Sequence, residues 1–185
     1  PPNFFTDKDL RKAFAYAFDY KGYLDDVNRG KGTQATGAIP KSLPGHNPNQ
    51  KKYSHDLAKA EEHLKKAWGG QVWEKGFKFT LTFNSGNVPR QTLCQILKKN
   101  IEQINPKFKI DVRPVLWSTF LDAVNSHKLP MFAMGWNADF PDPQLRLPAD
   151  ALQGGLPLHP EVHQPGGRQA HRRRAPGDGP GQEQG

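Results

Sequence analysis

The apolar run from Leu129 to Trp136 is the feature that most constrains the fold of this chain. Its residues do not alternate between apolar and polar, which is typical of a strand buried on both faces, as in the middle of a parallel sheet. Pro141 and Pro143 then exclude a continuing strand or helix. The sequence therefore predicts a buried strand that carries Trp136 and Asp139 into a loop at its carboxyl end, where open α/β sheets bind ligands.

A plainer interpretation of this segment remains open, in which Trp136 belongs to the core and Asp139 forms a turn. No catalytic constellation accompanies the segment, because the chain has no nucleophile elbow, no phosphate-binding glycine loop and no paired histidines. Asp139 and Asp142 lie three residues apart between prolines, which is a poor frame for acid–base catalysis. We therefore expect a binding protein, and an enzyme that uses these two carboxylates stays an alternative.

Strands and helices alternate in the central part of the chain. Phe77–Phe83 and Phe108–Val112 alternate between apolar and polar residues, and Met131–Trp136 is the third strand. A helix that begins at Pro89 and another capped by Ser118 connect them. Strand–helix–strand connections of this length place the strands parallel to one another. We predict an α/β lobe whose parallel or mixed sheet is flanked by helices.

Two amphipathic helices are predicted before this sheet. In the first, apolar residues recur at helical spacing after a cap at Thr6: Leu10, Ala13, Phe14, Ala17 and Phe18. The second begins after Ser54 and ends at Gly69. Glycine and proline are frequent between Gly30 and Lys52, so that stretch is predicted to be a loop.

Two loops are expected to leave the same edge of the predicted sheet. One follows the first strand and contains Asn84 and Gly86, and the other follows the third strand from Trp136 to Asp142. Both are rich in hydrogen-bonding groups, and Gly86 permits a close approach of the backbone to a ligand. This arrangement predicts one wall of a polar ligand site.

The segment Gly135-Trp-Asn-Ala-Asp-Phe-Pro-Asp-Pro143 resembles the GW-x-AD-[YF]-x-DP signature of the peptide-binding proteins of ATP-binding-cassette importers. Asp7–Asp19 and Gly37–Gly45 are similar to two further segments of that family, in the same order, so that the resemblance covers Phe4 to Pro143. It implies that residues 1–143 are part of the second lobe of a periplasmic-binding-protein-like (type II) fold, and that a further lobe precedes them in the complete protein.

The resemblance also implies a function. Members of this family capture peptides outside the cytoplasm, between two lobes, for transport by a membrane permease, and a lipoprotein anchor is one way of holding them there. It implies that Asp139 binds the ammonium terminus of the peptide, that Gly135 to Asn137 pair with the peptide backbone, and that Trp136 shapes the pocket. We expect a monomer without a cofactor or metal. A receptor of the same superfamily for a nickel chelate, an oligosaccharide or heme, or an inactive fragment, remains an alternative.

The composition limits the other classes of function. The net charge of +8 comes mostly from lysines on predicted helix faces, and no nucleic-acid-binding motif accompanies them, so we expect no nucleic-acid partner. No apolar run reaches the roughly 18 residues that a membrane span needs. Cys94 is the only cysteine, which excludes an internal disulfide and a cysteine-based zinc site. Its position on an apolar helix face predicts a buried, inert thiol.

Residues 144–185 differ from the rest of the chain. They contain no lysine and no aromatic residue, and 14 of these 42 residues are glycine or proline. A disordered tail is one interpretation. The other is translation in a neighbouring reading frame after Pro143, because codons that fit Gln144–Gly154, read one base later, encode Asn-Phe-Val-Tyr-Pro-Leu-Met-His-Ser-Lys-Gly, which is similar to the family's usual continuation. The arginines 172–174 would then form no nucleic-acid site.

The coding DNA tests the frame shift directly. We expect the codons of residues 144–172, read one base later, to encode an aromatic segment followed by Asn-Pro-Glu-Val-Asp. Sequencing this region is the measurement. Codons that give neither segment in the neighbouring frame would leave the tail as an ordinary linker.

Overall fold

The computed structural model describes residues 4–37, 39, 41, 45–135 and 160–161. Its centre is a three-stranded sheet in the order β3-β2-β4, formed by β2 (Phe77–Asn84), β3 (Phe108–Val115) and β4 (Met131–Ala133). Both strand pairs are parallel. The prediction of three adjacent parallel strands is therefore confirmed. The third strand is shorter than predicted, because β4 ends at Ala133 and Met134 and Gly135 belong to no strand, while Trp136 lies outside the described residues.

The order of the strands differs from the expectation in one respect. We predicted the Met131 strand to lie in the middle of the sheet, and in the described part of the chain β2 is the central strand and β4 lies at an edge. Met131 and Ala133 are still buried, because helices cover β4. β3 is the other edge strand and contains Pro114, which an edge strand tolerates because its missing N–H faces away from the ladder.

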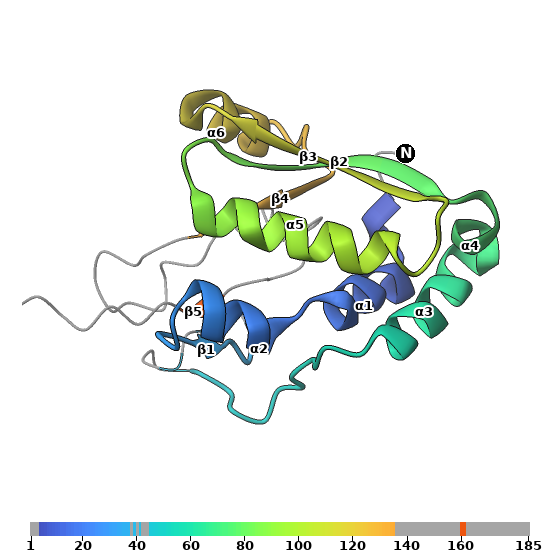
Figure 1. The fold of residues 1–185 in the computed structure, drawn as a ribbon, viewed down its shortest axis with the longest axis horizontal. Coiled ribbons are helices and arrows are strands. Elements are labelled where there is room, and N and C mark those ends of the chain that lie inside the picture. Colours follow the sequence, from blue (N-terminus) through green and yellow to red (C-terminus); the bar gives the residue numbers. More distant parts are fainter. Residues whose placement is uncertain (1–3, 38, 40, 42–44, 136–159, 162–185) are drawn as a thin grey trace, which may run out of the picture.

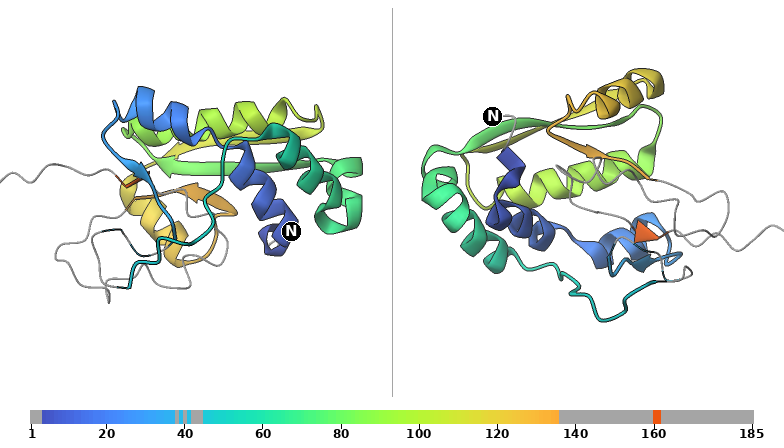
Figure 2. Two further views of the ribbon diagram at one scale, coloured as in Figure 1. Left: turned by 90° about the horizontal axis from the view of Figure 1, so that it is seen from below. Right: turned by 180° about the vertical axis from the view of Figure 1, so that it is seen from behind.

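Two helices connect the strands and cover opposite sides of the sheet (Figures 1 and 2). α5 (Val88–Glu102) joins β2 to β3, and α6 (Trp117–Asn125) joins β3 to β4. α5 buries Leu93, Leu97 and Ile101 as predicted, whereas the predicted inward residues Ile96 and Ile104 are only half-buried. α6 buries Phe120 and Val124.

The remaining elements pack around the end of the sheet at which β2 begins, or extend along α5 (Figure 1). They are η1 (Phe4–Thr6), α1 (Lys8–Ala17), α2 (Tyr20–Gly22), η2 (Tyr23–Val27), β1 (Thr33–Gln34), α3 (Leu57–Lys66), η3 (Ala67–Gly70) and α4 (Gln71–Lys75). Both predicted amphipathic helices are confirmed as α1 and α3, and these two helices pack against each other.

The helix caps differ from the predicted ones. Asp7, not Thr6, caps α1, since its Oδ1 accepts a hydrogen bond from the Leu10 amide at 2.8 Å. Asp56, not Ser54, caps α3 in the same way. Leu116 stands at the cap of α6 without a side-chain bond, so Ser118 lies inside the helix. At the start of α1 and at the start of α3, two residues that can cap a helix lie within two positions of each other. The sequence alone therefore does not decide which of the two forms the cap.

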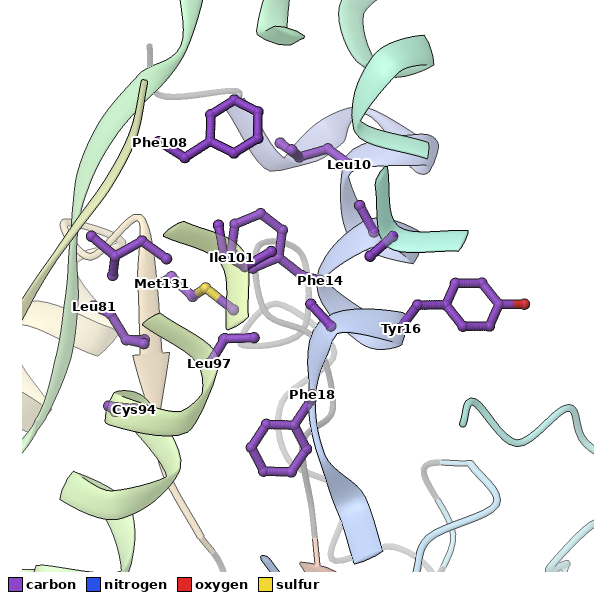
Figure 3. Packing of buried hydrophobic residues seen from close by; sticks show 14 of the residues in the cluster. Leu10, Phe14, Tyr16, Phe18, Leu81, Cys94, Leu97, Ile101, Phe108 and Met131 are labelled. Atoms are coloured by element: carbon purple, nitrogen blue, oxygen red, sulfur yellow. The ribbon is translucent and has the colours of Figure 1, made fainter. Parts of the chain in front are cut away.

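An aromatic cluster joins the amino-terminal helix to the sheet. The ring of Phe14 on α1 lies 6.0 Å from that of Phe77 and 5.9 Å from that of Phe79. Phe77 in turn stacks on Phe108 of β3 with centroids 4.5 Å apart. Phe14 points towards α5, whereas Tyr16 points away from α5 (Figure 3) and packs edge-on against Tyr53.

Only a short piece of the carboxyl-terminal region is described. Pro160–Glu161 forms β5, which pairs antiparallel with β1. The assignment of residues 144–185 to a neighbouring reading frame remains a prediction. Among the described residues, the structure contains no helix with the length and apolar character of a membrane span.

The packing of α5 generates a stability prediction. Leu97 is fully buried, so that Leu97→Ala removes apolar contacts and leaves a cavity that costs about 2–5 kcal/mol in the free energy of unfolding. Gln95→Ala, on the exposed side of the same helix, should change that energy by less than about 0.5 kcal/mol. Urea titrations of the two variants make the comparison, and equal losses would contradict the observed orientation of α5.

Candidate functional site

The carboxyl ends of the three parallel strands meet at one edge of the sheet (Figure 1). β2 ends at Asn84 and is followed by the turn Ser85–Asn87, while β4 ends at Ala133 and is followed by Met134 and Gly135. The Ser85 amide donates to the Val115 carbonyl at 2.7 Å, which fixes this turn to the end of β3.

The structure brings two of the predicted site residues, Asn84 and Gly135, to the same place. Gly86 lies in the adjoining turn, with its φ of 80° in the left-handed region, which glycine adopts without strain. Among the described residues, no heavy atom lies within 4 Å of the position that a Cβ would take at Gly86. The other predicted site residues, Trp136, Asn137 and Asp139, lie outside the described residues.

Arg90, which no sequence pattern indicated as a site residue, connects Asn84 with Gly135. Its Nη1 donates to Oδ1 of Asn84, and its Nη2 donates to the carbonyl oxygen of Gly135 at 3.3 Å. The Arg90 side chain is half-buried. Burial lowers the pKa of its guanidinium, and the nearby Tyr23 phenol acts in the opposite direction. The described part of the chain offers Arg90 no carboxylate in an ion pair.

Arg90 stands in the first turn of α5, where a cation is unusual. Asn87 caps this helix by accepting a hydrogen bond from the Arg90 amide at 3.0 Å. The first turn of α5 contains no acidic residue, although the helix dipole favours negative charge there and disfavours a cation. A guanidinium and a helix N-terminus therefore place positive potential together at this edge.

The contact with Arg90 also explains the glycine at position 135. A Cβ at Gly135 would lie 3.1 Å from Nη2 of Arg90, which is too close for an undisturbed contact. Gly135 has no left-handed φ. A side chain at position 135 would therefore require the guanidinium of Arg90 to shift by a few tenths of an ångström.

Exposed apolar side chains surround the same edge. Val88 at the start of α5 is 67% exposed, and Leu116 and Trp117 after β3 are 69% and 46% exposed. The Trp117 ring stacks on Phe120 with centroids 5.7 Å apart, and Phe120 meets Phe132 of β4 edge-on. The indole therefore rests on a buried support. The sequence signal for this feature was the apolar Val115-Leu-Trp117 after the second predicted strand.

Away from this edge, the ionisable groups in the described part of the chain form no reactive centre. His63 Nδ1 lies 2.8 Å from Oδ1 of Asp9, and its ring stacks on Tyr16 between α1 and α3. Cys94 is fully buried, and burial raises the pKa of its thiol to about 12, which confirms the predicted inert thiol. No group of three or more metal-ligating residues occurs among the described residues. The edge thus offers hydrogen-bonding groups and apolar surface for recognition.

The chain is similar to known proteins in both sequence and fold. It is 29% identical over 167 residues to the oligopeptide-binding protein AppA of Bacillus subtilis (strain 168), covering 82% of this chain and 30% of AppA. It is 24% identical over 137 residues to the probable D,D-dipeptide-binding periplasmic protein DdpA of Escherichia coli (strain K12), covering 74% of this chain and 25% of DdpA. The chain thus spans about a quarter to a third of the length of these relatives.

A solved structure supports the same relationship. The ABC transporter-associated periplasmic binding protein DppA of Helicobacter pylori, in complex with the peptide STSA, superposes with a TM-score of 0.65 at 25% identity and covers 82% of this chain and 27% of DppA. The predicted periplasmic-binding-protein-like lobe is therefore confirmed. Residues 2–153 match the sequence model of the bacterial extracellular solute-binding proteins, family 5 Middle. The chain belongs to the family 5 bacterial extracellular solute-binding proteins.

Proposed function

We propose that this chain is part of the extracytoplasmic receptor of an ATP-binding-cassette importer and that this receptor captures peptides between two lobes. One observation carries the proposal: in a chain of the solute-binding family, Arg90 holds the turn after β2 beside Gly135, where the signature segment begins. The peptides named for AppA and DppA support this class of ligand. The partner is a membrane permease, and the receptor acts by binding, without catalysis.

Asp139 is proposed to bind the ammonium terminus of the peptide. It follows Gly135 by four residues, and Gly135 is attached to the rigid end of the sheet through Arg90. A carboxylate near such an anchor can form a charge-assisted hydrogen bond to –NH₃⁺. Trp136 and Asn137, between these two residues, are proposed to shape the pocket and to pair with the peptide backbone.

The turn after β2 is proposed to face the peptide as well. Asn84 and Gly86 lie at the same edge as Gly135, and an extended peptide can add to such an edge through backbone hydrogen bonds. The exposed Leu116 and Trp117 offer apolar surface for the side chains of the ligand, as binding sites commonly do.

We predict that Asp139→Asn weakens peptide binding by about ten- to a hundredfold. The substitution keeps the shape and removes the charge, and a hydrogen bond to a charged group contributes about 1.5–3 kcal/mol. Calorimetry would measure binding to a two-lobed receptor completed around residues 4–143, with the neighbouring reading frame restored after Pro143. The 185-residue chain alone, without a facing lobe, should bind no peptide measurably.

Two controls make this test specific. Asp142→Asn makes the same charge change three residues further on and should leave the affinity within about twofold, as expected of a charge that makes no contact with the ligand. An N-acetylated peptide should bind the native receptor as weakly as the free peptide binds Asp139→Asn. Equal affinity for free and acetylated peptides would contradict the role of Asp139. Selective binding of heme, an oligosaccharide or a nickel chelate would instead assign the receptor to another ligand class.

A further inference from the structure

We propose that Arg90 is a positioning residue of the ligand site, and that its guanidinium sets the separation between the turn after β2 and the segment after β4. This inference rests on the proposed function, because these two segments are the ones proposed to face the peptide. Arg90 itself is assigned no contact with the ligand.

The ladder between β2 and β4 stops before the residues that Arg90 contacts. The pairing of β2 with β4 covers three positions and ends where Phe83 lies opposite Ala133. Asn84 and Gly135 both lie beyond that last pair. The two hydrogen bonds of Arg90 to these residues therefore continue the connection past the point at which the backbone ladder ends.

The guanidinium group of Arg90 is suited to joining two acceptors. The planar guanidinium presents several donors in a rigid fork, so that it can hold two acceptors in a defined relation, whereas a lysine ammonium is a point charge on a flexible stem. One acceptor here is a side-chain amide oxygen and the other a backbone carbonyl. Neither is charged, so charge neutralisation does not account for the contact.

The electrostatics of the first turn of α5 does not favour an arginine at position 90. A cation in the first turn of a helix opposes the helix dipole, and partial burial of a charge without an ionic partner is costly. The described residues supply no such partner, and the glycine at position 135 keeps room for Nη2. The observed contacts of Arg90 are the two hydrogen bonds at the strand ends, and these support a geometric role.

The contact with Arg90 also gives the carbonyl oxygen of Gly135 a hydrogen-bond partner. This oxygen accepts from Nη2 of Arg90 at 3.3 Å, so one of its two lone pairs is already used before a peptide binds.

Nitrogen-15 NMR of the arginine side chains of the 185-residue chain tests the clamp without any ligand. A guanidinium held at both Nη atoms rotates slowly, so we expect resolved, exchange-protected Nη signals for Arg90. Arg113, which is exposed and pairs with Asp111 through a single Nη2 contact, is the internal control and should give averaged signals. Averaged signals for Arg90 as well would overturn the proposal.

Peptide affinity of the completed receptor tests the consequence for binding. We expect Arg90→Lys and Arg90→Gln each to weaken binding by about tenfold, the size of one lost hydrogen bond to a charged group. The unfolding midpoint of Arg90→Lys should stay near that of the native receptor. Arg113→Gln makes the same charge change as Arg90→Gln and should leave the affinity unchanged. Native affinity in Arg90→Lys would show that charge is sufficient and would refute the clamp.

A double-mutant cycle links Arg90 to Gly135. Gly135→Ala should weaken binding because its Cβ displaces Nη2, and Gly135→Ala combined with Arg90→Lys should be no weaker than the poorer single variant, since both act through one contact. Additive losses would show independent roles and overturn the proposal. A native receptor that binds no peptide would refute the proposed function, while the NMR result would still decide whether Arg90 joins the two segments.

Discussion

The packing of α5 between the sheet and α1 is the contact on which the rest of this structure depends. Leu97 and Ile101 are fully buried on one side of α5, and Phe14 of α1 faces them (Figure 3). Asn100 on the same helix donates to the Ala17 carbonyl at 2.8 Å, at the end of α1. Because α5 is also the connection from β2 to β3, this packing determines where its first turn stands relative to the strand ends. The position of Arg90 is thus a consequence of burying the apolar face of α5.

The site at the carboxyl edge uses that rigid support in two ways. Arg90 reaches from α5 to both Asn84 and Gly135, and Trp117 is held at the surface by its stack on the buried Phe120. A ligand-facing group attached to packed elements loses little conformational entropy when a ligand binds, which favours affinity. The cation at the start of α5 and the partly exposed indole therefore lie at the same edge of the sheet.

The predictions made from residue patterns were wrong where the outcome depends on contacts between side chains and elements in the folded structure. The alternation in Phe77–Phe83 and Phe108–Val112 was sufficient to predict β2 and β3. The apolar run at Met131 indicated burial correctly, whereas in the described part of the chain β4 lies at an edge of the sheet, because helices as well as neighbouring strands can bury a strand. Thr6 and Ser54 were predicted as caps although Asp7 and Asp56 make the bonds, since each of these side chains is chemically able to cap a helix.

The sequence by itself determined the α/β class, the parallel strands, and the edge at which Asn84, Gly86 and Gly135 stand. These features follow from periodicity and connection length, which are local properties of the chain. Only the tertiary structure decided that β2 is central, that Arg90 joins Asn84 to Gly135, and that Trp117 is exposed at the same edge. These features depend on the direction of side chains from elements far apart in the sequence. Hydrogen bonds across 45 residues, as between Arg90 and Gly135, exist only after the helices have packed on the sheet.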